Sequence, residues 1–135
     1  MLRNVVLSVA TLVLGLTLSV TATASSSAAH CDKVLGDVEI ARESLAQLEH
    51  SLLDMDLEQG ELLGEIAGLE QEIAATQAKG RSIMALRADL DALKAEVALI
   101  EDLRPELIAQ RDALRTSVDA GERSYIACVE TVVGG

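Results

Sequence analysis

An acidic run in the first half of the chain has the spacing of a calcium-binding loop. Acidic side chains occupy positions 1, 3, 5 and 12 of such a loop: Asp54, Asp56, Glu58 and Glu65. The position that needs a turn-forming glycine is Gln59, however, and the position that needs an apolar residue is Glu61. Because a helical hydrophobic repeat also runs through this segment, we predict a solvated helix surface and no calcium site.

The histidines and serines do not form a catalytic group. His50 lies beside Glu49 and Asp54 at helical spacing, which could hold a metal weakly but is more typical of a solvated helix face. The serines at 25–27 have no histidine and acid arranged to activate them. We therefore predict a protein that is not an enzyme and that has no cofactor and no metal site.

The two cysteines, Cys31 and Cys128, are the residues whose chemistry we expect to matter. In an oxidising compartment, two cysteines allow a single intramolecular disulfide. A disulfide between two chains is the alternative. Lipid attachment at Cys31 is disfavoured, because the bulky His30 stands where that modification needs a small residue.

The first 24 residues have the pattern of a cleaved signal peptide. Arg3 is followed by an apolar run from Val5 to Leu18, and Ala22-Thr23-Ala24 supplies the small residues of a cleavage site, with Ala29 as a second candidate. The apolar run is shorter than the roughly 20 residues that span a bilayer. We therefore predict export to the periplasm or the extracellular space, with residues 25–30 as a flexible tail.

Composition and charge exclude several classes of partner. The chain has no Trp or Phe, and Tyr125 is its only aromatic residue, so a pocket lined by aromatic side chains is not expected. Without Arg3, ten basic residues stand against 22 acidic ones, a net charge of −12. We expect no binding to nucleic acid and no stable membrane insertion.

Two heptad repeats must position these residues, and both are typical of coiled coils. Twelve of the fourteen positions in the first repeat are apolar or Cys: Cys31, Val34, Val38, Ala41, Leu45, Leu48, Leu52, Met55, Gln59, Leu62, Ile66, Leu69, Ile73 and Thr76. Eleven of the fourteen in the second qualify: Ile83, Leu86, Leu90, Leu93, Val97, Ile100, Arg104, Leu107, Arg111, Leu114, Val118, Gly121, Tyr125 and Cys128. The phase breaks near Gly80.

A chain reversal between Lys79 and Gly80 would bring the two repeats together as a long antiparallel hairpin. Facing residues would then have numbers that add to 159, and Cys31 and Cys128 satisfy this condition. We therefore predict an all-α fold, with a two-helix coiled coil over residues 31–129, a disulfide joining its ends, and a C-terminal tail at 130–135.

Pro105 and two arginines interrupt the second repeat. Pro105 must kink or break a helix, so the alternative fold is a three-helix bundle broken at this residue. We favour a kink, because the repeat crosses Pro105 without a change of phase. Arg104 and Arg111 occupy seam positions opposite Met55 and Leu48, where they need to reach outward or to pair with acids such as Asp56 and Glu49.

The charges beside the predicted seam are unequal on its two sides. On one side Glu70 lies near Arg87 and Lys94, which is attractive. On the other side acidic residues face each other: Glu65 near Glu96, and Glu72 near Asp89. Only solvent, cations or a basic partner would relieve this acidic stripe.

Apolar and small residues outside the seam suggest a further contact. The apolar ones are Ile40, Leu53, Leu57, Leu99, Leu103 and Ile108. Gly60, Gly64 and Gly68 recur at a spacing of four and would permit close helix approach. A homodimer that forms a four-helix bundle would use this surface; otherwise these glycines only loosen the first helix.

The sequence thus favours an exported structural or adaptor coiled coil that does not catalyse a reaction. Its partner protein is not identified by the sequence. The tip formed by Lys79, Gly80 and Arg81 is locally basic on an acidic chain, which suits contact with an acidic patch. Two alternatives are a holdase-like periplasmic chaperone and a membrane-anchored protein that bridges the envelope and retains its leader.

Overall fold

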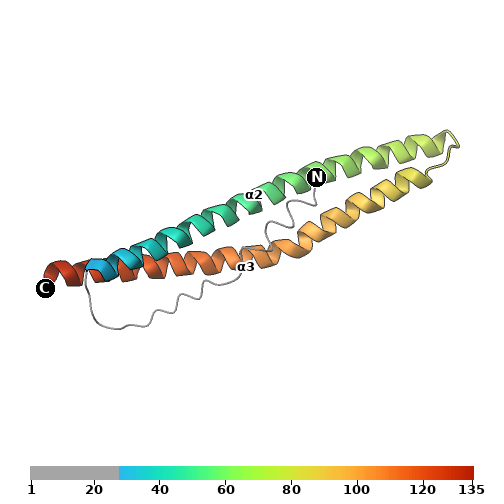
Figure 1. Cartoon of the computed structure of the whole chain (residues 1–135). Helices are drawn as coiled ribbons and strands as arrows, with labels where there is room; N and C mark the ends of the chain where they lie inside the picture. Colours follow the sequence, from blue (N-terminus) through green and yellow to red (C-terminus); the bar gives the residue numbers. More distant parts are fainter. Residues whose placement is uncertain (1–27) are drawn as a thin grey trace. The chain divides into compact units, whose positions relative to one another are not determined.

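The computed structural model describes residues 28–135, which form two long helices. The predicted signal peptide and residues 25–27 of the predicted tail lie outside the described residues. Helix α2 spans Ala28–Ala78 and helix α3 spans Met84–Gly134, with no strand in the described range (Figure 1). The predicted antiparallel helical hairpin is therefore confirmed.

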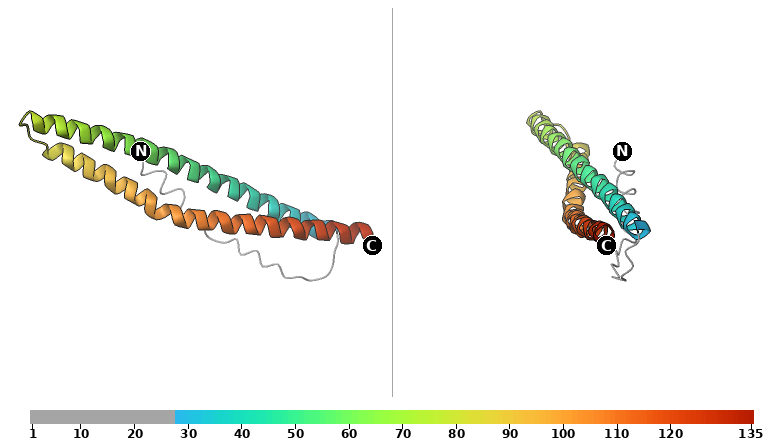
Figure 2. Two further views of the ribbon diagram at one scale, coloured as in Figure 1. Left: turned by 180° about the vertical axis from the view of Figure 1, so that it is seen from behind. Right: turned by 90° about the vertical axis from the view of Figure 1, so that its left-hand side faces the viewer.

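Residue contacts divide the hairpin into two units, each of which pairs a part of α2 with a part of α3. The clasp unit comprises the described residues up to Gln47 together with Asp112–Gly135. The tip unit comprises Leu48–Arg111, including the turn. Within each unit the two helix segments lie side by side in all the views (Figures 1 and 2).

The predicted heptad positions form the core of both units. Among the described residues all eleven buried hydrophobic residues belong to the two repeats: Cys31, Val38, Ala41, Leu52, Met55, Leu62, Ile66, Val97, Ile100, Leu107 and Val118. The other seam positions are half-buried, and none is exposed. Burial thus follows the heptad pattern, as expected when an aliphatic stripe is the only apolar surface that two helices can share.

The turn is a helix C-cap built around Gly80. Helix α2 ends at Ala78, and Gly80 has a φ of 67°, in the left-handed region that favours glycine. The Gly80 N–H donates to the Gln77 carbonyl at 2.9 Å, and the Arg81 N–H donates to the Thr76 carbonyl at 3.2 Å. These two bonds are those of a Schellman motif, which satisfies carbonyls at the end of α2.

The disulfide joins Cys31 to Cys128, with their Cα atoms 5.7 Å apart. This confirms the predicted intramolecular pairing. The bond closes a loop with a sequence separation of 97 residues. In the chain-entropy account, closing a loop of this size stabilises the fold by about 4–5 kcal/mol.

In the clasp unit, Val38 of α2 also lies against Gly121 of α3, in the same pairing register as the two cysteines. A Cβ atom added to Gly121 would lie 2.6 Å from Cγ2 of Val38, so the backbone of α3 passes directly against the buried Val38 side chain. The numbers of Val38 and Gly121 add to 159, as do those of the two cysteines. Glycine is therefore needed at position 121 because helix packing leaves no room for a side chain.

Helix α3 continues through Pro105 without interruption. The alternative of a three-helix bundle broken at this residue is wrong. Pro105 lies on an exposed face, so the carbonyl that loses its helical donor can bind water. The kink itself stays a prediction.

Both outer boundaries of the hairpin differ from those predicted. Residues 28–30, assigned to a flexible tail, belong to α2, and residues 130–134, assigned to a C-terminal tail, belong to α3. Alanine at the start of α2 favours helix. At the other end, helix hydrogen bonds continue past the last seam residue, where sequence periodicity gives no signal.

A polar layer around Arg104 interrupts the aliphatic core of the tip unit. Arg104, whose side chain is 26% exposed, donates to Oδ1 of Asp56 at 2.7 Å and also donates to Oε1 of Gln59. The Gln59 amide in turn donates to Glu101 at 3.3 Å. The predicted pairing of Arg104 with Asp56 is confirmed, and the guanidinium reaches outward from the seam to meet it.

We expect replacement of Gly80 by alanine to destabilise the turn. A left-handed backbone costs an L residue about 1–2 kcal/mol, so Gly80→Ala should lower the free energy of unfolding by about 1 kcal/mol. Gly68→Ala is the matched control, because its Cβ would meet nothing within 4 Å in the middle of α2. It should raise stability by about 0.5–1 kcal/mol. Urea unfolding of both variants would contradict this if they shifted the midpoint alike.

Gly121→Ala should destabilise the clasp unit, in contrast to Gly68→Ala. We expect a loss of about 1–3 kcal/mol from overpacking. In Val38→Ala/Gly121→Ala the new methyl group occupies space that Val38 vacates, so the double variant should lose less than the sum of the two single variants. Additive losses in thermal unfolding would show that the two residues are not in contact.

Replacing Arg104 by methionine should leave stability unchanged or raise it by about 1 kcal/mol. An apolar chain of similar length fits the seam without the desolvation of a partly buried charge. Asp56→Ala should lower stability by less than about 1 kcal/mol, because the carboxylate is 63% exposed. Both effects are measured by urea unfolding, and a loss of several kcal/mol in Arg104→Met would contradict this account of the polar layer.

Candidate interaction surface

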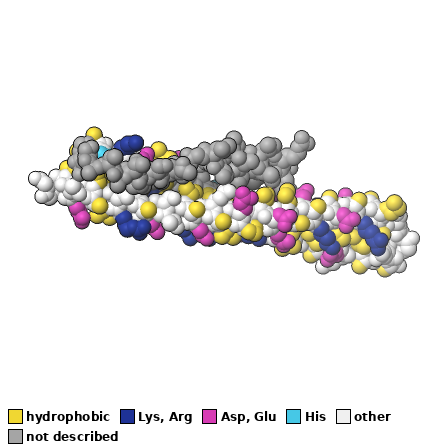
Figure 3. Space-filling view, turned by 90° about the horizontal axis from the view of Figure 1, so that it is seen from below, with side chains coloured by type: hydrophobic (Ala, Val, Ile, Leu, Met, Phe, Trp, Pro, Cys, Tyr) yellow, Lys and Arg dark blue, Asp and Glu magenta, His cyan; other side chains and the backbone are white. Residues whose placement is uncertain are grey.

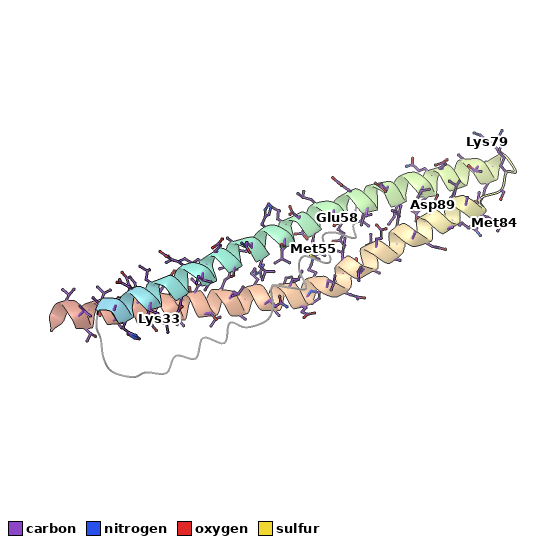
Figure 4. The ribbon with its side chains drawn as sticks, in the orientation of Figure 1. Lys33, Met55, Glu58, Lys79, Met84 and Asp89 are labelled. Atoms are coloured by element: carbon purple, nitrogen blue, oxygen red, sulfur yellow. A yellow bond between two sulfur atoms is a disulfide. The ribbon has the colours of Figure 1, made fainter. Side chains whose placement is uncertain are left out.

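The turn displays the three residues that the sequence predicted as a contact point. Lys79, Gly80 and Arg81 are all exposed, and Lys79 and Met84 lie on the two sides of the turn (Figure 4). Neither Lys79 nor Arg81 forms an ion pair with any described residue. The two cations therefore extend from a backbone that the C-cap holds in one conformation, and both are available to an anionic partner.

Exposed aliphatic side chains lie along the outer faces of both helices. The predicted ones include Ile40, Leu53, Leu57 and Leu99, which are 55%, 56%, 62% and 44% exposed. Leu103 and Ile108, which were also predicted, are half-buried beside the seam. Several large hydrophobic side chains remain in water because a two-helix hairpin covers only one stripe of each helix.

Two further exposed aliphatic residues in the tip unit were not singled out from the sequence. Leu63 is 50% exposed and Met84 is 81% exposed. Leu63 occupies the heptad position that flanks the seam, so extending the register by one position would have found it. Met84, the first residue of α3, directly follows the seam residue Ile83, so the same register would have placed it outside the seam.

The glycine ridge of α2 is not used within the hairpin. A Cβ atom added to Gly60, Gly64 or Gly68 would meet nothing within 4 Å. Close approach to α3 therefore does not explain these residues, in contrast to Gly121. All three are exposed on the outer surface of α2.

One side of the tip unit carries both signs of charge, and we call it the mixed flank. Between residues 53 and 108 its acids are Asp56, Glu70, Asp91 and Glu101, and its bases are Arg87, Lys94 and Arg104. Two ion pairs cross it from α2 to α3: Glu70 with Lys94 at 3.2 Å, as predicted, and Asp56 with Arg104 at 2.7 Å. Hydrophobic, acidic and basic side chains are intermixed towards the turn on the face seen in Figure 3.

The opposite side, the acidic flank, carries one sign of charge. Within the two helices over the same range, the heptad register places eight acids there and no base: Asp54, Glu58, Glu61, Glu65, Glu72, Asp89, Glu96 and Glu106. Five of them lie nearest the seam, Glu58, Glu65, Glu72, Asp89 and Glu96, and these five form no ion pair with any described residue. Their carboxylates are left to solvent and counterions.

The residues with metal-binding chemistry lie apart. His50 is 3.5 Å from Asp54 through Nε2 and Oδ2, and its side chain is 75% exposed. The segment from Asp54 to Glu65 lies in the middle of α2, so its carboxylates follow a helix and do not surround a loop. Within residues 28–135 no three His, Cys, Asp or Glu side chains are placed to share a metal ion.

The outer surfaces are thus the part of the molecule on which a functional interpretation must rest. Neither α2 nor α3 is apolar over a long enough stretch to cross a membrane. No protein-family model, curated protein or solved structure matches the chain.

Proposed function

We propose that the chain is an exported coiled-coil interaction or structural adaptor protein that does not catalyse a reaction. The observation that carries this proposal is the two-helix hairpin itself, whose interior is filled by the aliphatic seam. A partner would then bind to the outer faces, where rigid helices display charged and aliphatic side chains.

The disulfide supports export to the periplasm or the extracellular space. A bond between Cys31 and Cys128 persists in an oxidising compartment and is reduced in the cytosol. The leader pattern in residues 1–24 leads to the same compartment.

The tip supports contact with an acidic patch on a partner protein. Lys79 and Arg81 are exposed cations at the turn of a hairpin that is otherwise strongly acidic. The acidic helices repel an acidic patch, whereas the cations of the tip attract it. The tip is therefore the part of the hairpin that such a patch would contact. Electrostatics therefore orients the hairpin end-on.

A holdase-like chaperone is the second candidate. Leu53 and Leu57 are exposed by 56% and 62% beside acidic side chains, a combination that suits unfolded basic clients. Such a protein would suppress the aggregation of many clients, and Leu53→Gln/Leu57→Gln would abolish the effect. An adaptor that binds through its tip would be insensitive to this change.

A tip-directed crosslinking experiment tests the adaptor function. A photo-crosslinking amino acid replaces Arg81 in one variant and Lys33, an exposed cation of the clasp unit (Figure 4), in the other. We expect one discrete adduct in cells from position 81, and none from position 33. Lys79→Glu added to the first variant should remove the adduct, because it reverses a charge without altering a buried residue.

The protein from the same cultures also tests export and the alternative of a membrane-anchored protein that retains its leader. Intact mass should give a chain that starts at Ser25 and is lighter than the reduced form by the two hydrogens that disulfide formation removes. Adducts of equal yield from positions 81 and 33 would overturn the tip contact. Free thiols in the cytosol would overturn export, and retention in the membrane after a high-salt wash would favour the anchored alternative.

A further inference from the structure

The two flanks of the tip unit differ in what they can accept from a second copy of the chain. The acidic flank carries eight acids and no base, whereas the mixed flank carries four acids and three bases. Contact between two acidic flanks would place unpaired carboxylates of the same sign against each other. Of the two flanks, the mixed flank is therefore the one suited to face its own copy.

The mixed flank also carries the apolar surface that a stable contact needs. Leu53, Leu63 and Met84 are exposed by 56%, 50% and 81%. Gly60 lies between the two leucines along α2, and a Cβ there would meet nothing within 4 Å, so a neighbouring helix has room to approach. In a four-helix bundle these flanking positions become part of the core.

The area of this face is close to the area that each partner buries in a stable dimer. Helix segments of about 30 residues are about 45 Å long, and two helices side by side are about 20 Å wide. The resulting face of about 900 Å² compares with the roughly 800 Å² that each partner contributes to a standard interface. The tip unit alone is therefore large enough to hold two copies together.

The distribution of charge on the mixed flank selects one arrangement. Among the side chains that border the seam, the α2 side has the acids Asp56 and Glu70, and the α3 side has the bases Arg87 and Lys94 and one acid, Glu101, which accepts a hydrogen bond from Gln59. A two-fold axis along the helices places α2 of one copy over α3 of the other, so Glu70 meets the two bases near the turn. A two-fold axis across the helices places α2 over α2, so acids meet acids.

Arg87 gives this arrangement a specific contact. It is exposed and forms no ion pair within the described part of the chain. In the register of the hairpin it lies close to the level of Glu70, whose other neighbour is Lys94. In the parallel arrangement Glu70 of each copy faces Arg87 of the second copy, which relieves the unpaired cation.

We propose that two copies of the chain pair face to face through the mixed flanks of their tip units. The two copies are parallel, with both turns at the same end and α2 of each over α3 of the other. The acidic flanks then lie on the two outer surfaces of the dimer. This inference goes beyond the adaptor function, because it concerns self-association and is tested without any other partner.

Light scattering at a series of protein concentrations gives the native mass and tests whether the mixed flank is the dimer interface. The oxidised chain, as recovered from cells, should have twice the mass of the monomer. Leu63→Glu places a charge in the interface and should give the monomer, whereas Leu99→Glu, a matched control on the acidic side of α3, should stay a dimer. Helix content and melting temperature show whether each variant is folded.

Charge reversal at position 70 tests the arrangement. With α2 over α3, Glu70→Arg places like charges together and should raise the dissociation constant at least about tenfold. Adding Arg87→Glu should restore the dimer. With α2 over α2, Glu70→Arg would tighten the dimer instead, which would overturn the parallel arrangement.

The remaining outcomes also decide the proposal. A wild-type chain that stays monomeric at every concentration, or a folded Leu63→Glu variant that stays dimeric, would overturn the mixed flank as the interface. If the Leu99→Glu variant were monomeric, the interface would lie on the acidic flank and the proposal would be wrong. A monomer that still gives the tip adduct would reject self-association and leave the adaptor function intact.

Discussion

The antiparallel register of α2 and α3 decides which side chains meet in the seam. Three separate features fix it: the left-handed Gly80 that ends α2, the close contact of Val38 with Gly121, and the disulfide of Cys31 with Cys128. A slip of either helix along the other would break all three. It would also carry the aliphatic side chains of the seam out of alignment and leave their apolar surface in water.

A hairpin of two helices has little core for its length, and its composition reflects this. The seam is aliphatic and buries no large aromatic side chain, so each layer contributes modestly to stability. In the clasp unit the seam includes Ala41 and Gly121, which bury less apolar surface than leucine would. The disulfide lies in this unit, where a covalent link replaces stabilisation that small side chains cannot supply.

The two flanks of the tip unit divide its surface into complementary roles. The mixed flank offers aliphatic side chains and both signs of charge, which suits a close and specific contact. The acidic flank offers unpaired carboxylates, which keep the molecule hydrated and repel acidic surfaces. In the proposed adaptor function, an acidic patch meets the cations of the turn, which lie at the end of this acidic surface.

The helices, the facing seams, the turn and the cysteine pair could all be predicted from the order of the residues. These features depend on local periodicity and on the symmetry of a hairpin about its turn, so residue numbers were enough to state them. The sequence left open whether Pro105 ends a helix, since the cost of a proline depends on whether the freed carbonyl can reach water. The heptad register placed Gly121 in the seam and Gly60 and Gly68 outside it, but it did not show how closely the two helices approach. In the folded hairpin a side chain at position 121 would collide with the buried Val38, whereas one at position 60 or 68 would meet nothing within 4 Å, because those positions face solvent.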